Sequence, residues 1–187
     1  MKVVCCIPAR LTSSRLPRKV FLEINGKPII QHVIERCGKA TRINKIVVAT
    51  TINKEDDELY NFLHDKFYDV GVYRGDPKNI VSRLVRIAEL EKADIIINCD
   101  CEQPLADHRL IDKTIEVIEL GYPFAYIGGV PRGMTVYAFA VDYLKQIATT
   151  KDCNTDEHWY KLFEIEDGTC IDTEEDYQIL KGLMEEK

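Results

Sequence analysis

Short apolar runs alternate along the chain with segments in which apolar residues recur every three or four positions. The runs at 3–7, 46–49 and 95–97 have the length and composition of buried strands. In 29–37 and 78–92 the apolar residues instead fall on one helical face. This alternation predicts an α/β fold, with a three-layer, mostly parallel, Rossmann-like sheet and helices on both faces.

The rest of the chain continues the same alternation. Ile95, Ile96 and Ile97 form the most apolar strand, which is therefore expected at the centre of the sheet. Asn53, with Asp56 three residues later, is predicted to cap one helix, and Asp107 another. Five apolar residues are predicted to form the buried side of that second helix: Leu110, Ile111, Ile115, Val117 and Ile118. The run at 46–49 belongs to a strand expected over 43–50. Further strands are expected at 70–73, 124–127, 134–140 and 170–171, with helices through 143–147 and from 172 onward.

A cluster of cations follows the first predicted strand. Residues 10–19, called here the basic loop, carry four cations among three small hydroxyls: Arg10, Arg15, Arg18 and Lys19 with Thr12, Ser13 and Ser14. A loop at the carboxyl end of the first strand is where open α/β sheets bind ligands. Cations with hydroxyl and backbone N–H donors suit a polyanion, most simply a triphosphate. An ordinary basic surface loop is the alternative.

Composition narrows the class of protein. The 187 residues carry a formal net charge of -6, so no overall field draws the chain to nucleic acid or to an anionic membrane. No apolar stretch approaches the roughly 20 residues that span a bilayer, and the first apolar run is too short for a signal peptide. Without repeats, low-complexity segments or linkers, we expect one cytoplasmic domain over residues 1–187.

The cysteines predict a reduced interior. There are seven, and those at 5, 6, 37, 99 and 170 lie in or beside apolar runs, where a reduced cysteine behaves as a small hydrophobe. The spacing of Cys99 and Cys101 is too tight for a zinc ribbon, and no second pair follows at a suitable distance. We therefore expect neither a disulfide framework nor a structural metal site.

The basic loop also resembles the amino-terminal signature of the sugar-acid cytidylyltransferases. The residues that carry the resemblance are Ile-Pro-Ala-Arg at 7–10, Ser-Ser-Arg-Leu-Pro at 13–17, Lys19 and Ile-Asn-Gly-Lys-Pro at 24–28. This family includes CMP-KDO synthetase, CMP-sialic acid synthetase and the spore-coat polysaccharide (SpsF-like) enzymes. The resemblance implies a fold of the nucleotide-diphospho-sugar transferase type.

The resemblance implies roles for several residues of the basic loop. Arg10, Ser13, Ser14, Arg15 and Lys19 would hold the phosphates of CTP, and Arg10 and Lys19 would also act in catalysis. One position departs from the family: Arg18 stands where relatives usually carry Gly. Its long side chain would either crowd the phosphates or add a contact.

Nucleotidyl transfer requires a divalent cation, here Mg²⁺, which takes carboxylate oxygens. Acids at the carboxyl ends of predicted strands are Asp100, Glu102 and Asp172. Asp172 matches the first Asp of the family's closing motif, a metal ligand, although it would also serve to cap the last helix. Where the family has Gly-Asp before Pro-Leu, an ungapped match places Cys101 and Glu102. Either Glu102 or Asp100 is then the ligand, or the chain is a catalytically weakened relative.

Two further positions resemble family features. Arg74 lies in a turn that in the family is near the cytosine and ribose, with a solvated surface arginine as the alternative. His158 looks like part of the Glu-His pair of the SpsF-like branch, on the sugar side. The segments around 126–131 and 160–169, which in relatives shape the sugar pocket and dimer contact, are shorter here.

Together these features predict an enzyme that transfers CMP from CTP to a sugar or sugar acid, with Mg²⁺, and releases pyrophosphate. A homodimer is expected from the resemblance; nucleic-acid and membrane partners are not. Another NTP, a phosphonate acceptor, or nucleotide binding without turnover are the alternatives.

Overall fold

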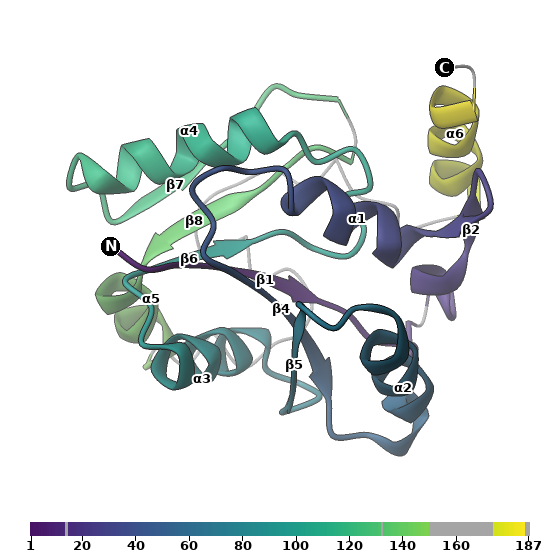
Figure 1. Cartoon of the computed structure of the whole chain (residues 1–187), viewed down its shortest axis with the longest axis horizontal. Helices are drawn as coiled ribbons and strands as arrows, with labels where there is room; N and C mark the ends of the chain where they lie inside the picture. The colour runs from purple at the N-terminus through teal and green to yellow at the C-terminus, as the bar shows by residue number, and fades with distance from the viewer. Residues whose placement is uncertain (14, 132, 150–173, 186–187) are drawn as a thin grey trace.

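The computed structural model describes residues 1–13, 15–131, 133–149 and 174–185, whose path is drawn in Figure 1. These residues build a six-stranded sheet in the order β5-β4-β1-β6-β8-β7. The strands are β1 (Val3–Pro8), β4 (Lys45–Thr51), β5 (Gly71–Gly75), β6 (Ile95–Asn98), β7 (Phe124–Tyr126) and β8 (Tyr137–Ala140).

The strand directions confirm a mostly parallel sheet. β5, β4, β1 and β6 run parallel to one another, whereas β8 is antiparallel to both β6 and β7. β1 and β6 lie at the centre, which confirms the place predicted for β6 from its apolar composition. The carboxyl ends of four neighbouring strands therefore meet at one edge of the sheet, the edge at which loops of such folds bind ligands.

Helices cover both faces of this sheet (Figure 1). They are α1 (Ile29–Cys37), α2 (Asp57–Lys66), α3 (Ile80–Glu91), α4 (His108–Glu119), α5 (Val141–Ala148) and α6 (Glu174–Glu185). Two short 3-10 helices precede α1 and α2: η1 (Lys19–Phe21) and η2 (Lys54–Asp56). Buried residues of α3 and α5 pack on one face, and those of α1, α2 and α4 on the other.

A small hairpin lies outside the main sheet. β2 (Glu23–Ile24) pairs with β3 (Lys27–Pro28) across a turn in which Asn25 and Gly26 both have positive φ, as a two-residue hairpin turn requires. Helix α6 packs against it (Figure 1): the Tyr177 hydroxyl donates to the carbonyl of Glu23 at 2.7 Å. The last described helix thus packs on the hairpin formed by β2 and β3.

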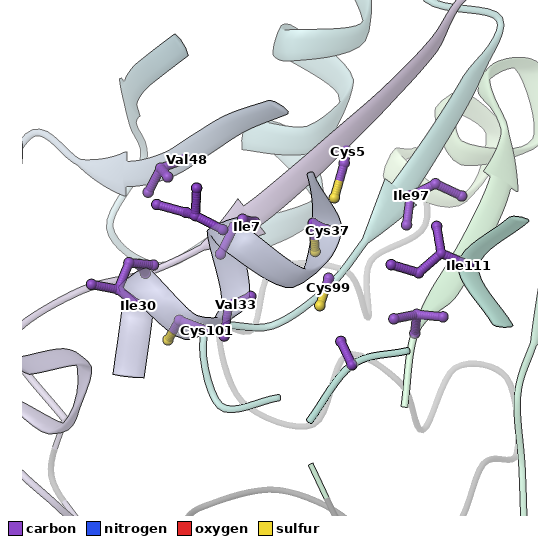
Figure 2. Packing of buried hydrophobic residues seen from close by; sticks show 14 of the residues in the cluster. Cys5, Ile7, Ile30, Val33, Cys37, Val48, Ile97, Cys99, Cys101 and Ile111 are labelled. Carbon is purple, nitrogen blue, oxygen red and sulfur yellow. The ribbon is translucent and has the colours of Figure 1, made fainter. Parts of the chain in front are cut away.

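Buried cysteines fill part of the interior. Cys5 and Cys6 alternate between the two faces of β1, and Figure 2 shows the sulfur atoms of Cys5, Cys37 and Cys99 next to one another. Burial raises the pKa of the Cys6 thiol. The prediction that cysteines serve as small hydrophobes is confirmed for Cys5, Cys6, Cys37 and Cys99, whereas Cys170 lies outside the described residues. Cys101, which the pattern left outside the core, is buried as well.

Several predictions about local structure were wrong. Asn53 and Asp56 make no side-chain capping bond, because the Asp56 carboxylate is directed elsewhere and a 3-10 turn precedes α2. Val117 is 36% exposed, since it lies beside the buried stripe of α4 rather than on it. The strand expected at 134–140 forms only over Tyr137–Ala140. Asp107 does cap α4, as predicted, by accepting from the Arg109 N–H at 2.9 Å.

Candidate active site

The basic loop leaves β1 at the carboxyl edge and folds around Leu11, whose side chain is buried. The Leu11 N–H donates to Asp56 Oδ1 at 2.7 Å. Its carbonyl accepts from the N–H groups of Ser13 and Arg18, each at 3.0 Å. The start and the end of the loop are therefore joined at the backbone of Leu11, which gives the loop a fixed turn rather than an extended path.

The clearest contact at this edge is an ion pair between Lys19 and Glu102. Lys19 ends the basic loop and is buried, whereas Glu102 lies in the segment after β6 and its side chain is 21% exposed. That segment stays beside β1, because the Cys101 N–H donates to the carbonyl of Pro8 at 3.2 Å. A predicted phosphate-binding cation and a predicted metal ligand, 83 positions apart in sequence, are thus brought together.

Other charges gather around the same point. Burial raises the pKa of the Cys101 thiol; the nearby charges of Glu102 and Asp100 raise it further, whereas those of Lys19 and Arg10 oppose the change. All four charged side chains therefore lie close enough to act on one buried group. The roles predicted for these cations and carboxylates stay predictions.

Asp100 and Glu102 differ in their surroundings. Asp100 Oδ1 accepts from the Asn98 side-chain amide at 3.0 Å, which holds it at the end of β6, whereas Glu102 faces Lys19. Both are carboxylates at the carboxyl edge and fit the oxygen ligands that Mg²⁺ prefers. Over the part of the chain that the structure describes, no three potential metal ligands are grouped together. Mg²⁺ needs no such group, because it is usually held by one or two carboxylates together with phosphates and waters.

The remaining loop residues are placed as follows. Arg10 Nη1 reaches the carbonyl of Pro77, in the turn after β5, at 3.5 Å. The Ser13 hydroxyl accepts from the Leu16 N–H at 3.3 Å, and Arg15 is exposed. Ser14, Asp172 and His158 lie outside the described residues, so their predicted roles stay predictions.

Arg18, the departure from the family, turns toward α2. It has a left-handed backbone (φ 58°) and makes two bonds to the Glu58 carboxylate, at 2.8 and 2.7 Å. Its guanidinium also lies 5.5 Å from the centre of the Phe21 ring. A left-handed backbone favours Gly, so Arg18 holds a conformation that residues with a side chain adopt rarely. Arg18 also borders an open hollow of about 650 Å³, lined by Phe21, Glu23, Pro28, Glu58, Asn61 and Phe62 as well.

Arg74 is held by the turn between β4 and α2. Its Nε and Nη2 donate to the carbonyls of Thr51 and Asn53, at 2.9 and 2.8 Å, and its Nη1 pairs with Asp57 at 2.7 Å. The guanidinium lies 5.6 Å from the centre of the Tyr60 ring. The side chain is therefore not simply solvated: it fixes the shape of the turn that ends β4. Its role at a nucleotide stays a prediction.

Asp56 is the residue that sequence reasoning missed. It is completely buried, and its carboxylate accepts from the Leu11 N–H and from the Thr51 hydroxyl. In sequence it stands between two other acids, Glu55 and Asp57, and resembles an ordinary first-turn acid of a helix. The sequence indicates for Asp56 only a part in capping the helix with Asn53, and gives no sign that its carboxylate turns inward to Leu11.

With this geometry in view, comparison with known proteins identifies the class. Residues 4–161 match the sequence model of the Cytidylyltransferase family. The chain belongs to this family, and the resemblance drawn from the basic loop is confirmed.

Individual relatives agree. The 3-deoxy-manno-octulosonate cytidylyltransferase of Syntrophobacter fumaroxidans is 34% identical over 122 residues, which cover 64% of this chain and 47% of that protein. A cytidylyltransferase structure from Leptospira borgpetersenii has a TM-score of 0.85 at 23% identity, covering 100% of this chain and 88% of that one. A CMP:2-keto-3-deoxy-manno-octonic acid synthetase solved with CTP has a TM-score of 0.73 at 22% identity, covering 100% and 99%. At such identities the two structures establish the shared fold.

Length separates this chain from its curated relatives. It spans about half the length of the Syntrophobacter enzyme. The helices of the described ranges are all too short or too polar to cross a bilayer. Family and fold are thus established, whereas activity and substrate have to be argued from the site.

Proposed function

We propose that the chain is a cytidylyltransferase enzyme that transfers CMP from CTP to a sugar acid and releases pyrophosphate. One observation carries the proposal: in a chain of this family, Lys19 of the basic loop pairs with Glu102 after the central strand β6. The two groups have the charges needed at opposite sides of a nucleotide and its metal.

The residues of this site divide the work by charge. Lys19 and Arg10 would bind the triphosphate and offset the charge that leaves with pyrophosphate. The same loop would add further hydrogen-bond donors to the phosphate oxygens, namely the hydroxyls of Ser13 and Ser14 and the guanidinium of Arg15. Binding requires that Lys19 exchange the Glu102 carboxylate for a phosphate oxygen.

The acids would hold Mg²⁺. Glu102 or Asp100, together with Asp172 outside the described residues, would supply its carboxylate ligands. Held by these carboxylates, Mg²⁺ would supply positive charge that offsets part of the charge of the triphosphate. Glu102 is released for this role when Lys19 turns to the phosphates, so the same exchange prepares both groups.

The sugar acid is suggested by the relatives. The Syntrophobacter relative is named for 3-deoxy-manno-octulosonate, an eight-carbon sugar acid, and a related sugar acid is proposed as the acceptor here. His158 would lie on the acceptor side, and the homodimer expected from the resemblance in the basic loop is kept as part of the proposal.

The test is pyrophosphate release from CTP and Mg²⁺ with a panel of sugar acids, read beside thermal unfolding with each NTP. The expected result is a rise in unfolding temperature with CTP larger than with ATP, GTP or UTP, and pyrophosphate release with at least one sugar acid. CTP binding without turnover of any acceptor would contradict the proposed enzyme activity and would indicate a protein that only binds the nucleotide. Preference for another NTP would contradict the assignment of CTP.

A further inference from the structure

We propose that Asp56 is a positioning residue, which holds the basic loop in its ligand-binding shape from behind the site. The inference rests on the proposed function, because the loop is taken to bind the phosphates of CTP. Asp56 acts through Leu11, the residue directly after Arg10, whose N–H donates to its carboxylate.

The first step is the burial of the charge. The side chain of Asp56 is completely enclosed, and an enclosed carboxylate is costly unless it accepts hydrogen bonds. Its two oxygens accept from different segments, Oδ1 from the Leu11 N–H at 2.7 Å and Oδ2 from the Thr51 hydroxyl. The carboxylate therefore joins the basic loop, the end of β4 and the start of α2.

The second step is what the backbone of Leu11 controls. Its N–H is fixed by Asp56, while its carbonyl accepts from Ser13 and Arg18 at 3.0 Å each. The two peptide groups that flank Leu11 are therefore both held, the first by Asp56 and the second by Ser13 and Arg18, which fixes the backbone on both sides of this residue. Hydrogen bonds to an ionised acceptor are stronger than neutral ones, which makes Asp56 the strongest of these attachments.

The third step is electrostatic. A negative charge behind a loop that binds a polyanion repels the ligand, since like charges disfavour one another. Direct attraction therefore cannot be what Asp56 contributes to binding. Its contribution is geometric: a loop that is ordered before the ligand arrives loses less conformational freedom on binding.

The hydrogen-bond network around Asp56 extends into the turn that Arg74 holds. The Thr51 hydroxyl also accepts from the Asn53 N–H at 3.2 Å, and the carbonyls of both residues accept from Arg74. Asp56 thus couples the basic loop to the turn predicted to lie near the base and ribose. Loosening it should affect the triphosphate part of the site first, because that is the part attached through Leu11.

The experiment compares Asp56→Asn with Glu55→Gln. Asn keeps the size of Asp56 but loses the charge and one acceptor oxygen. Glu55 is the adjacent acid, exposed, and its substitution makes the same change of charge. Affinities for CTP and for cytidine are measured by titration, and exchange of the Leu11 amide proton is followed by NMR. Thr51→Val, which removes the other partner of the carboxylate without a change of charge, is the second variant.

Asp56→Asn is expected to weaken CTP binding about tenfold, the equivalent of one charge-assisted hydrogen bond, and cytidine binding much less. The Leu11 amide should exchange faster, Thr51→Val should shift both readouts in the same direction, and Glu55→Gln should match the wild type. Equal weakening of CTP and cytidine, or unchanged CTP affinity in both variants, would overturn the proposal. Failure of the wild type to bind CTP would instead count against the proposed function, while unchanged Leu11 exchange would overturn the positioning role by itself.

Discussion

Replacing Glu102 by Gln perturbs the ion pair on which the proposed site depends. The Lys19 side chain is 7% exposed and that of Glu102 is 21% exposed, so the pair is largely shielded from water. In Glu102→Gln, Lys19 keeps its charge but loses the carboxylate. The variant should therefore be less stable alone and respond more strongly to an anionic ligand.

The size of the effect follows from burial. Removing one partner of a buried pair costs roughly 3–5 kcal/mol; the partial exposure of Glu102, and the amide oxygen that Gln still offers, lower the expected loss to about 2 kcal/mol. For a chain of this length that corresponds to a fall of about 4–8 °C in Tm. When CTP supplies a phosphate oxygen to Lys19, much of this loss should be recovered.

Thermal unfolding with EDTA, with and without CTP, measures both effects. CTP should raise the Tm of Glu102→Gln by more than it raises that of the wild type, while Mg²⁺-dependent pyrophosphate release should fall steeply. Glu35→Gln is the matched control, because Glu35 is an α1 acid that pairs with Lys27 of β3. This variant should show the wild-type response to CTP. An equal CTP response in Glu102→Gln and the wild type would refute the exchange of partners at Lys19.

Further predictions concern stability and access. Asp107→Ala should cost about 1 kcal/mol of unfolding free energy; the hydrogen bonds from the Arg109 side chain hold the pKa of Asp107 below its usual range, so in pH-dependent unfolding this difference should persist above about pH 4 and shrink below it. Arg18→Gly should unfold at a higher temperature than Arg18→Ala, because only Gly relieves the left-handed backbone; the reverse order would contradict that reading. Phe139→Ala should cost about 3–5 kcal/mol in denaturant titration, since the ring is fully buried. Of the seven cysteines, the five buried thiols should react with a thiol reagent only after denaturation, so more than two reactive thiols in the native protein would be inconsistent.

The parts of the fold that the sequence predicts are those governed by local periodicity. Strand β1 and helix α1 are read from apolar spacing, and the centrality of β6 from its uniform Ile content. The approach of Lys19 to Glu102 was also predictable, because both follow the carboxyl ends of neighbouring parallel strands. These inferences need only strand order and the rule that parallel strands share an edge.

The parts that were missed depend on contacts between distant segments. Asp56 lies in a run of three acids, and only the fold decides which of them turns inward to Leu11. From the sequence, Arg74 is either a residue that contacts the nucleotide or a solvated side chain. In the structure its hydrogen bonds and its ion pair go to the turn that begins at Thr51. Neither partner is within helical or strand spacing of its residue, so no periodic signal reports the contact.

A structure determined with CTP and Mg²⁺ tests the central claim most directly. The account predicts the triphosphate at the carboxyl edge of the sheet, with Lys19 bonded to phosphate oxygens and Glu102 or Asp100 turned to the metal. CTP bound elsewhere, for instance in the hollow beside Phe21 and Phe62, with the Lys19–Glu102 pair intact, would contradict it.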